Sequence, residues 1–197
     1  MTQDKDTKVV GIFGDSFGYV KSNHEFLGWV EMLSTHVAVK NFCQCGSSQY
    51  RILQTLKSTD LNQFDQLIIT HTSPTRVFAR HNPLHADNPV YQNCDLLFAD
   101  VEGRKDSFSV MAQQYFKMLF DFHYSLDVHN MICREIDELC INLHCLHITH
   151  FDYINCYQFV NMINFFPIWS KNRGPVHHYN KHGNQYVFEN IINKLGS

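Results

Sequence analysis

The stretch Val9-Val10-Gly11-Ile12-Phe13-Gly14-Asp15-Ser16-Phe17-Gly18 decides the fold. Its first half is short and apolar, which predicts a buried strand. Gly14 and Gly18 permit backbone angles that other residues avoid, so the chain can turn sharply and present Ser16 at the strand end. In an open parallel sheet, ligands bind outside this carboxyl edge. Ser16 is therefore a candidate nucleophile, although Gly-Asp-Ser is also an ordinary turn sequence.

Helix and strand patterns alternate after this turn. The run Ser22-Asn23-His24-Glu25 has the form of a capping box and predicts the start of a helix. That helix would place Phe26, Leu27, Val30 and Leu33 on one face. Residues 37–42 and 65–70 predict the second and third strands, and a helix with Ile52, Leu53 and Leu56 on its apolar side lies between them. This order predicts parallel pairing with right-handed crossovers.

Residues 71–105 interrupt the alternation. The segment holds three prolines and several asparagines and is longer than an ordinary connection. Because it follows a parallel strand, we expect it to lie beside Ser16 as an insertion that covers the active site. With the aromatic stretch around Trp169, it is expected to form much of the pocket wall.

The second half of the chain predicts two helices and a fourth strand. Ser107 can cap the first helix, and the second follows it directly. Their apolar stripes are Met111, Tyr115, Met118 and Phe122, and then Val128, Ile132, Ile136, Leu139 and Leu143. Residues 144–149 predict the strand, and residues 152–174 are aromatic and irregular. We expect one domain over residues 1–197: a three-layer α/β/α sandwich around a flavodoxin-like parallel sheet of about four to five strands.

Near its end the chain reads His178-Tyr179-Asn180-Lys181-His182-Gly183, followed by a helical pattern. Together with Gly14-Asp15-Ser16, this block resembles the SGNH (GDSL-type) hydrolases in motif and in position along the chain. The resemblance implies that Ser16 is the nucleophile and His178 the general base. It also implies an oxyanion site formed by the backbone N–H groups of Ser16 and Gly46. Gly46 is equally well explained as a plain turn glycine.

Two blocks depart from the family pattern. The family's oxyanion asparagine after the third strand is absent, and the sequence there runs from Thr70 to Arg76. His71, Thr72 and Arg76 are possible substitute donors, since each carries N–H or O–H groups, and Thr72 is included in the predicted oxyanion site. His71, Arg76 and Trp169 are predicted to bind substrate, and Arg76 has an equally good interpretation as a structural residue.

The second departure concerns the acid that orients the histidine. The family places an aspartate three residues before it, and Pro175 stands there in this chain. Taking His177 as the base would place Gly174 at that position, which is no better. Only His178 has the right spacing to Asn180 and Gly183, so the sequence predicts a Ser–His dyad.

A metal site is the main competing interpretation of the thirteen histidines and seven cysteines. His144, His147 and His150 are three apart, and such positions on a strand face opposite sides. A phosphate-binding role for Gly14 to Gly18 is another alternative, but it leaves the His178 block unexplained. We therefore expect no metal and no cofactor.

Composition narrows the function further. The net charge of −3 gives no sign of a nucleic-acid partner, and no run approaches the roughly 18 apolar residues of a membrane span. The polar start of the chain is unlike a signal peptide, so we expect reduced thiols and a cytoplasmic location. The predicted function is hydrolysis of a carbohydrate O-acyl group or another small ester. The alternative is a degenerate domain that binds a ligand or partner without turnover.

Overall fold

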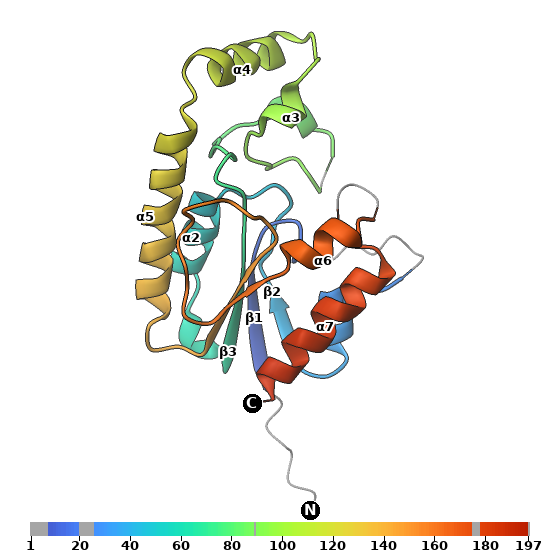
Figure 1. Cartoon of the computed structure of the whole chain (residues 1–197). Helices are drawn as coiled ribbons and strands as arrows, with labels where there is room; N and C mark the ends of the chain where they lie inside the picture. Colours follow the sequence, from blue (N-terminus) through green and yellow to red (C-terminus); the bar gives the residue numbers. More distant parts are fainter. Residues whose placement is uncertain (1–7, 20–25, 89, 175–177, 197) are drawn as a thin grey trace, which may run out of the picture.

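The computed structural model describes residues 8–19, 26–88, 90–174 and 178–196, and its centre is an all-parallel sheet (Figure 1). The strands follow the spatial order β2-β1-β3-β4-β5. Their bounds are β1 Val9–Gly14, β2 Ala38–Asn41, β3 Gln66–His71, β4 Cys145–Thr149 and β5 Met162–Asn164. This is the flavodoxin-like order, in which the chain reverses its direction of winding between β1 and β3. The predicted fold class is confirmed.

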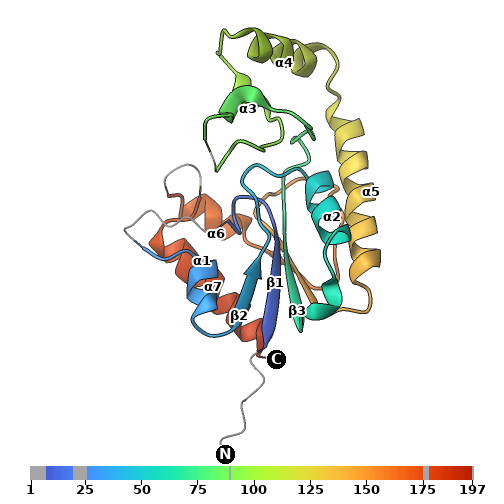
Figure 2. The same cartoon turned by 180° about the vertical axis from the view of Figure 1, so that it is seen from behind.

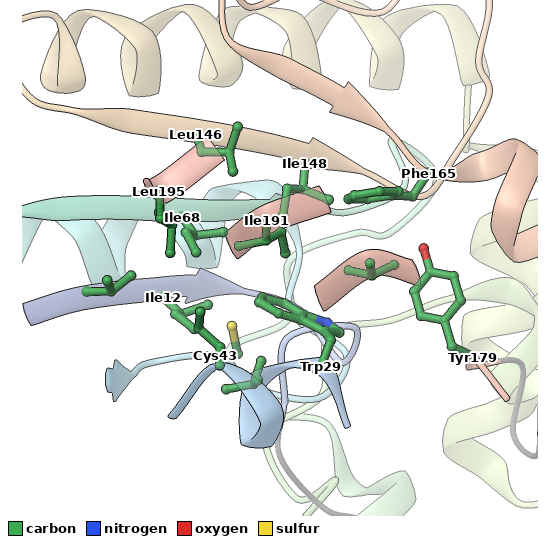
Figure 3. Close-up of a cluster of buried hydrophobic side chains, with 14 residues drawn as sticks. Ile12, Trp29, Cys43, Ile68, Leu146, Ile148, Phe165, Tyr179, Ile191 and Leu195 are labelled. Carbon is green, nitrogen blue, oxygen red and sulfur yellow. The ribbon is translucent and has the colours of Figure 1, made fainter. Parts of the chain in front are cut away.

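Helices cover both faces of the sheet, so the molecule has three layers (Figures 1 and 2). Helices α1 (Trp29–Ser34) and α7 (Lys181–Leu195) cover one face, and α2 (Gln49–Lys57) and α5 (Phe122–Cys140) cover the other. Side chains alternate along each strand, so Val10 and Ile12 enter the first core, whereas Phe13 enters the second. Figure 3 shows the first core, where Ile12, Trp29 and Ile191 meet between the sheet and its two helices.

The irregular stretch expected over residues 152–174 contains two elements. Strand β5 is three residues long, and α6 (Phe166–Lys171) follows it almost directly. Such a short strand has no readable alternation of apolar and polar residues, and β5 is held by pairing with β4 alone. Strand β5 therefore forms through its pairing with β4, and its local sequence does not predict it.

Helix α1 begins later than the sequence predicts. Its N-cap is Gly28, whose N–H donates to the Glu31 carboxylate at 2.7 Å. Leu27 precedes the helix and is exposed, which corrects its assignment to the buried face. The predicted capping box, Ser22 to Glu25, lies outside the described residues.

The segment after β3 holds two short helical turns, η2 (Pro83–His85) and α3 (Phe98–Val101), and an antiparallel bridge between Val77 and Leu96. A further turn, η1 (Leu61–Gln63), precedes β3. Helix α4 (Ser107–Met118) follows, and Figure 1 shows α3 and α4 beyond the carboxyl end of the sheet. No helix of the described residues is long and apolar enough to cross a membrane.

Two expectations for α4 are wrong. Asp106, rather than Ser107, is its N-cap, because the Asp106 carboxylate accepts the Ser109 N–H at 2.9 Å. Met111 and Met118, expected on a buried stripe, are 61% and 79% exposed. Their periodicity is helical, but α4 projects away from the sheet and has no core to cover them (Figure 1).

Candidate active site

Ser16 lies in the turn directly after β1, beside the β1–β3 switch point. The turn is anchored to both neighbouring strands: the Asp15 N–H donates to Thr70 Oγ1 at 3.2 Å, and the Gln44 N–H donates to the Gly14 carbonyl at 3.0 Å. Gly14 has φ +151°, and a Cβ there would lie 1.9 Å from Thr70 Oγ1. The glycine is therefore required for the close approach of the β1 turn to β3.

The Asp15 carboxyl group is buried directly beneath this turn. Burial raises its pKa to about 6, because the charged form loses its hydration. The Phe17 N–H, which donates to Asp15 Oδ1 at 3.0 Å, opposes that rise, as do the Arg76 charge and the hydroxyls of Thr70 and Thr72. Asp15 thus holds the backbone that follows Ser16.

Three donors in the turns after β1 and β2 have no acceptor. Among the described residues, neither the hydroxyl nor the N–H of Ser16 forms a hydrogen bond, and the N–H of Gly46 forms none. Gly46 adopts a left-handed conformation with φ +69° in the turn after β2. Its carbonyl accepts the Asp95 N–H at 2.8 Å, which fixes the peptide plane on that side. Unpaired N–H groups beside a serine hydroxyl are the chemical requirement of an oxyanion site.

His178 lies against the residue that follows Ser16. Its ring centroid is 5.3 Å from that of Phe17, in an edge-on arrangement. The segment is held by the His178 carbonyl, which accepts the Gly174 N–H at 2.6 Å. Asn180 then caps α7, accepting the Gly183 N–H at 2.9 Å. His178 thus lies near the turn that carries Ser16, which we call the Ser16 corner together with Phe17 and His178. The Ser16–His178 hydrogen bond itself stays a prediction. Such contacts commonly tighten when substrate binds.

Pro175, at the position of the acid, and His177, the alternative base, lie outside the described residues. The prediction of a dyad without an aspartate is therefore untested.

His71 and Thr72 are tied into the interior. Gln49 binds both of them, since its Nε2 lies 2.7 Å from His71 Nδ1 and its Oε1 accepts the Thr72 N–H at 3.3 Å. His71 Nε2 lies 3.0 Å from His147 Nδ1, and burial keeps the pKa of His71 well below its usual value. The backbone donor of Thr72 would have to leave Gln49 before it could serve an oxyanion. Their predicted roles in substrate binding and oxyanion stabilisation remain untested.

Arg76 joins the segment after β3 to the turn after β2. Its Nη1 donates to the Asp95 carbonyl at 3.1 Å and to the Gly46 carbonyl at 3.4 Å, and it lies 3.7 Å from Asp100 Oδ2. Trp169 lies on α6, with its ring 6.3 Å from Phe17 and the Arg173 guanidinium 4.2 Å from its centroid. Both side chains are near the Ser16 corner, and their predicted contact with substrate is untested.

Two cavities open along the carboxyl edge of the sheet. The smaller, about 250 Å³, is lined by His71 and Thr72 together with residues of the β4–β5 connection. The larger, about 390 Å³, is lined by Arg76, by the start of α2 and by the α4–α5 junction. Neither of these two is lined by Ser16 or His178, so we assign neither to the ester itself.

The histidines and cysteines do not converge on an ion. Within residues 8–19, 26–88, 90–174 and 178–196, no three histidine, cysteine or acidic side chains lie close enough together to hold a metal. His147 packs on Phe159, whereas His150 packs on Phe17 and Tyr179 toward the α7 face. All seven cysteines are free, and six of them are buried.

Comparison with known proteins adds little to this geometry. No family model matches the sequence, and no curated protein does. One solved structure that matches is a catalytic mutant of Axe2, an acetylxylan esterase from Geobacillus stearothermophilus. The two chains are 12% identical, with 98% of this chain and 95% of that chain covered and a TM-score of 0.42. A likeness this weak carries no conclusion about activity, so the fold rests on the strand order.

Sequence reasoning missed His150 as a member of this corner. His150 follows β4 directly, as Ser16 follows β1, and it is fully buried. The rule that functional side chains follow parallel strands could have found it. The regular spacing of His144, His147 and His150 instead suggested a metal site.

Proposed function

We propose that this protein is a serine hydrolase of the SGNH type that cleaves an ester, with a carbohydrate O-acyl group or another small ester as the substrate class. The observation that carries the proposal is the set of unpaired donors in the turns after β1 and β2: the Ser16 hydroxyl and the N–H groups of Ser16 and Gly46. The contact of the His178 ring with Phe17, the residue after Ser16, supports the assignment of His178 as the base.

The reaction follows from these positions. Ser16 Oγ attacks the ester carbonyl carbon while His178 takes the hydroxyl proton, and the carbonyl oxygen becomes an oxyanion. The N–H groups of Ser16 and Gly46 donate to that oxyanion. The tetrahedral intermediate expels the alcohol, which receives the proton from His178, and leaves an acyl group on Ser16. Water, deprotonated by His178, then releases the acid and restores the serine.

A second candidate is a domain that binds a ligand without turnover. It is favoured by the residues after β3, where the family pattern has an oxyanion donor and this chain has His71 and Thr72 committed to Gln49. The two candidates differ in whether Ser16 can be acylated.

Labelling with a fluorophosphonate probe, followed by peptide mapping, tests the proposal. Wild-type protein should be labelled at Ser16 and should hydrolyse a short-chain aryl ester, and Ser16→Ala should lose both properties while it stays folded. Ser73→Ala is the matched control, because Ser73 also follows a strand but is hydrogen-bonded to Tyr153 at 2.8 Å. Unchanged turnover in Ser16→Ala would remove Ser16 from the mechanism. An unlabelled and inactive wild type would instead support the second candidate, a domain that binds a ligand without turnover.

A further inference from the structure

His150 is a buried imidazole with an unusual environment. It is 0% exposed, and its Nδ1 lies 2.6 Å from the Tyr179 hydroxyl. Its Nε2 is also buried and has no hydrogen-bond partner among the described residues. Burying a polar atom without a partner is unfavourable, because the atom loses its hydrogen bonds to water. An apolar side chain would fill the same space without that cost, so packing alone does not explain a histidine here.

The rings around His150 come from the two segments that carry Ser16 and His178. Phe17, which follows Ser16, stacks on His150 with 4.1 Å between centroids and 12° between planes. Tyr179, which follows His178, meets His150 edge-on at 5.5 Å. Phe17 and Tyr179 also contact each other, with centroids 5.6 Å apart. The neighbour of the nucleophile and the neighbour of the base therefore pack on one imidazole.

The strand that directly precedes His150 is well anchored. Strand β4 lies inside the sheet, paired with β3 on one side and β5 on the other. The other two segments are turns, whose geometry depends on what they pack against. A stack restrains the distance of Phe17 from the sheet, and a hydrogen bond restrains the rotation of Tyr179, so His150 restrains both turns relative to β4.

We propose that His150 is a positioning residue that holds the Ser16 turn and the His178 segment in register. The inference rests on the proposed hydrolase function. The hydrogen bond between His150 and Tyr179 acts on His178 through the backbone, because Tyr179 is the next residue in the chain. Burial lowers the pKa of His150 to about 3, so the ring is neutral at the pH of any ordinary assay and keeps one nitrogen as an acceptor for the Tyr179 hydroxyl.

Two variants remove the hydrogen bond and keep an aromatic ring stacked on Phe17. Tyr179→Phe removes only the hydroxyl, and His150→Phe keeps an aromatic ring on Phe17 but removes the acceptor. Since a displacement of about 1 Å at a reacting group can cost roughly 100-fold in rate, we expect kcat to fall by about 10- to 100-fold in both variants, with KM little changed. The rate of fluorophosphonate labelling at Ser16 should fall in parallel.

Tyr157→Phe is the control for a general loss of stability. It removes a phenolic hydrogen bond to Asp137 of 2.7 Å at a site away from Ser16, and kcat should stay at the wild-type value. Thermal melting of all three variants shows whether each is folded under assay conditions. If kcat is normal in folded Tyr179→Phe and the wild type is labelled at Ser16, the positioning role fails while the hydrolase stands. If the wild type is inactive and unlabelled, both proposals fail.

Discussion

Replacing Gly46 with alanine tests the backbone of the candidate oxyanion site. At φ +69° a side chain is strained, which costs about 1–2 kcal/mol. The new Cβ would also lie 2.5 Å from Cys94 Sγ and 2.8 Å from Cys94 Cβ, and such overpacking costs about 1–3 kcal/mol. We therefore expect Gly46→Ala to lower the free energy of unfolding by about 2–5 kcal/mol.

Gly103→Ala is the matched control for this change. Gly103 has φ +74°, and a Cβ there meets no atom within 4 Å, so only the backbone strain of about 1–2 kcal/mol applies. Urea unfolding followed by circular dichroism measures both variants. Part of the Gly46→Ala loss should be recovered when Cys94→Ala is added, because the sulfur leaves the space that the new methyl group needs. Equal losses at Gly46 and Gly103, with no coupling to Cys94, would refute the steric argument.

Three further predictions concern side chains around the same corner. Burial raises the pKa of Asp15 to about 6 from an ordinary 3.8, so its contribution to stability is present in acid and lost as the pH rises through about 6. Between pH 4 and pH 8 the stability of Asp15→Asn relative to wild type should therefore rise by about 2.4 kcal/mol in urea titrations, and a pH-independent difference would contradict this. Arg76→Ala should lower kcat/KM, and lysine at this position should restore little of the loss. A lower melting temperature with normal kinetics would instead show that Arg76 has only a structural role, through its contacts to Asp95 and Asp100. Asn180→Ala should cost about 1 kcal/mol of unfolding free energy through the lost α7 cap, and an unchanged urea midpoint would show that the Gly183 N–H finds another acceptor.

Sequence patterns predicted the sheet because its strands obey a local rule. The buried runs of β1 and β3 are continuous and apolar since both faces are covered, and their order along the chain implies parallel pairing. Helix α5 was equally readable, as its apolar stripe faces the sheet. Helix α4 shows the limit of the rule, because periodicity reports a helix but not whether anything covers it.

The candidate site was also predictable only in part. Gly14, Ser16 and the spacing of His178, Asn180 and Gly183 are local features, and the sequence alone was enough to select them as candidates. Only the tertiary structure decides the rest. Strand pairing brings Asp15 within range of the Arg76 charge, brings His71 and Thr72 to Gln49, and stacks His150 on Phe17, which lies more than a hundred residues earlier in the chain. These contacts depend on which side chains meet across the carboxyl edge of the sheet. The spacing of residues along the chain does not specify such long-range contacts.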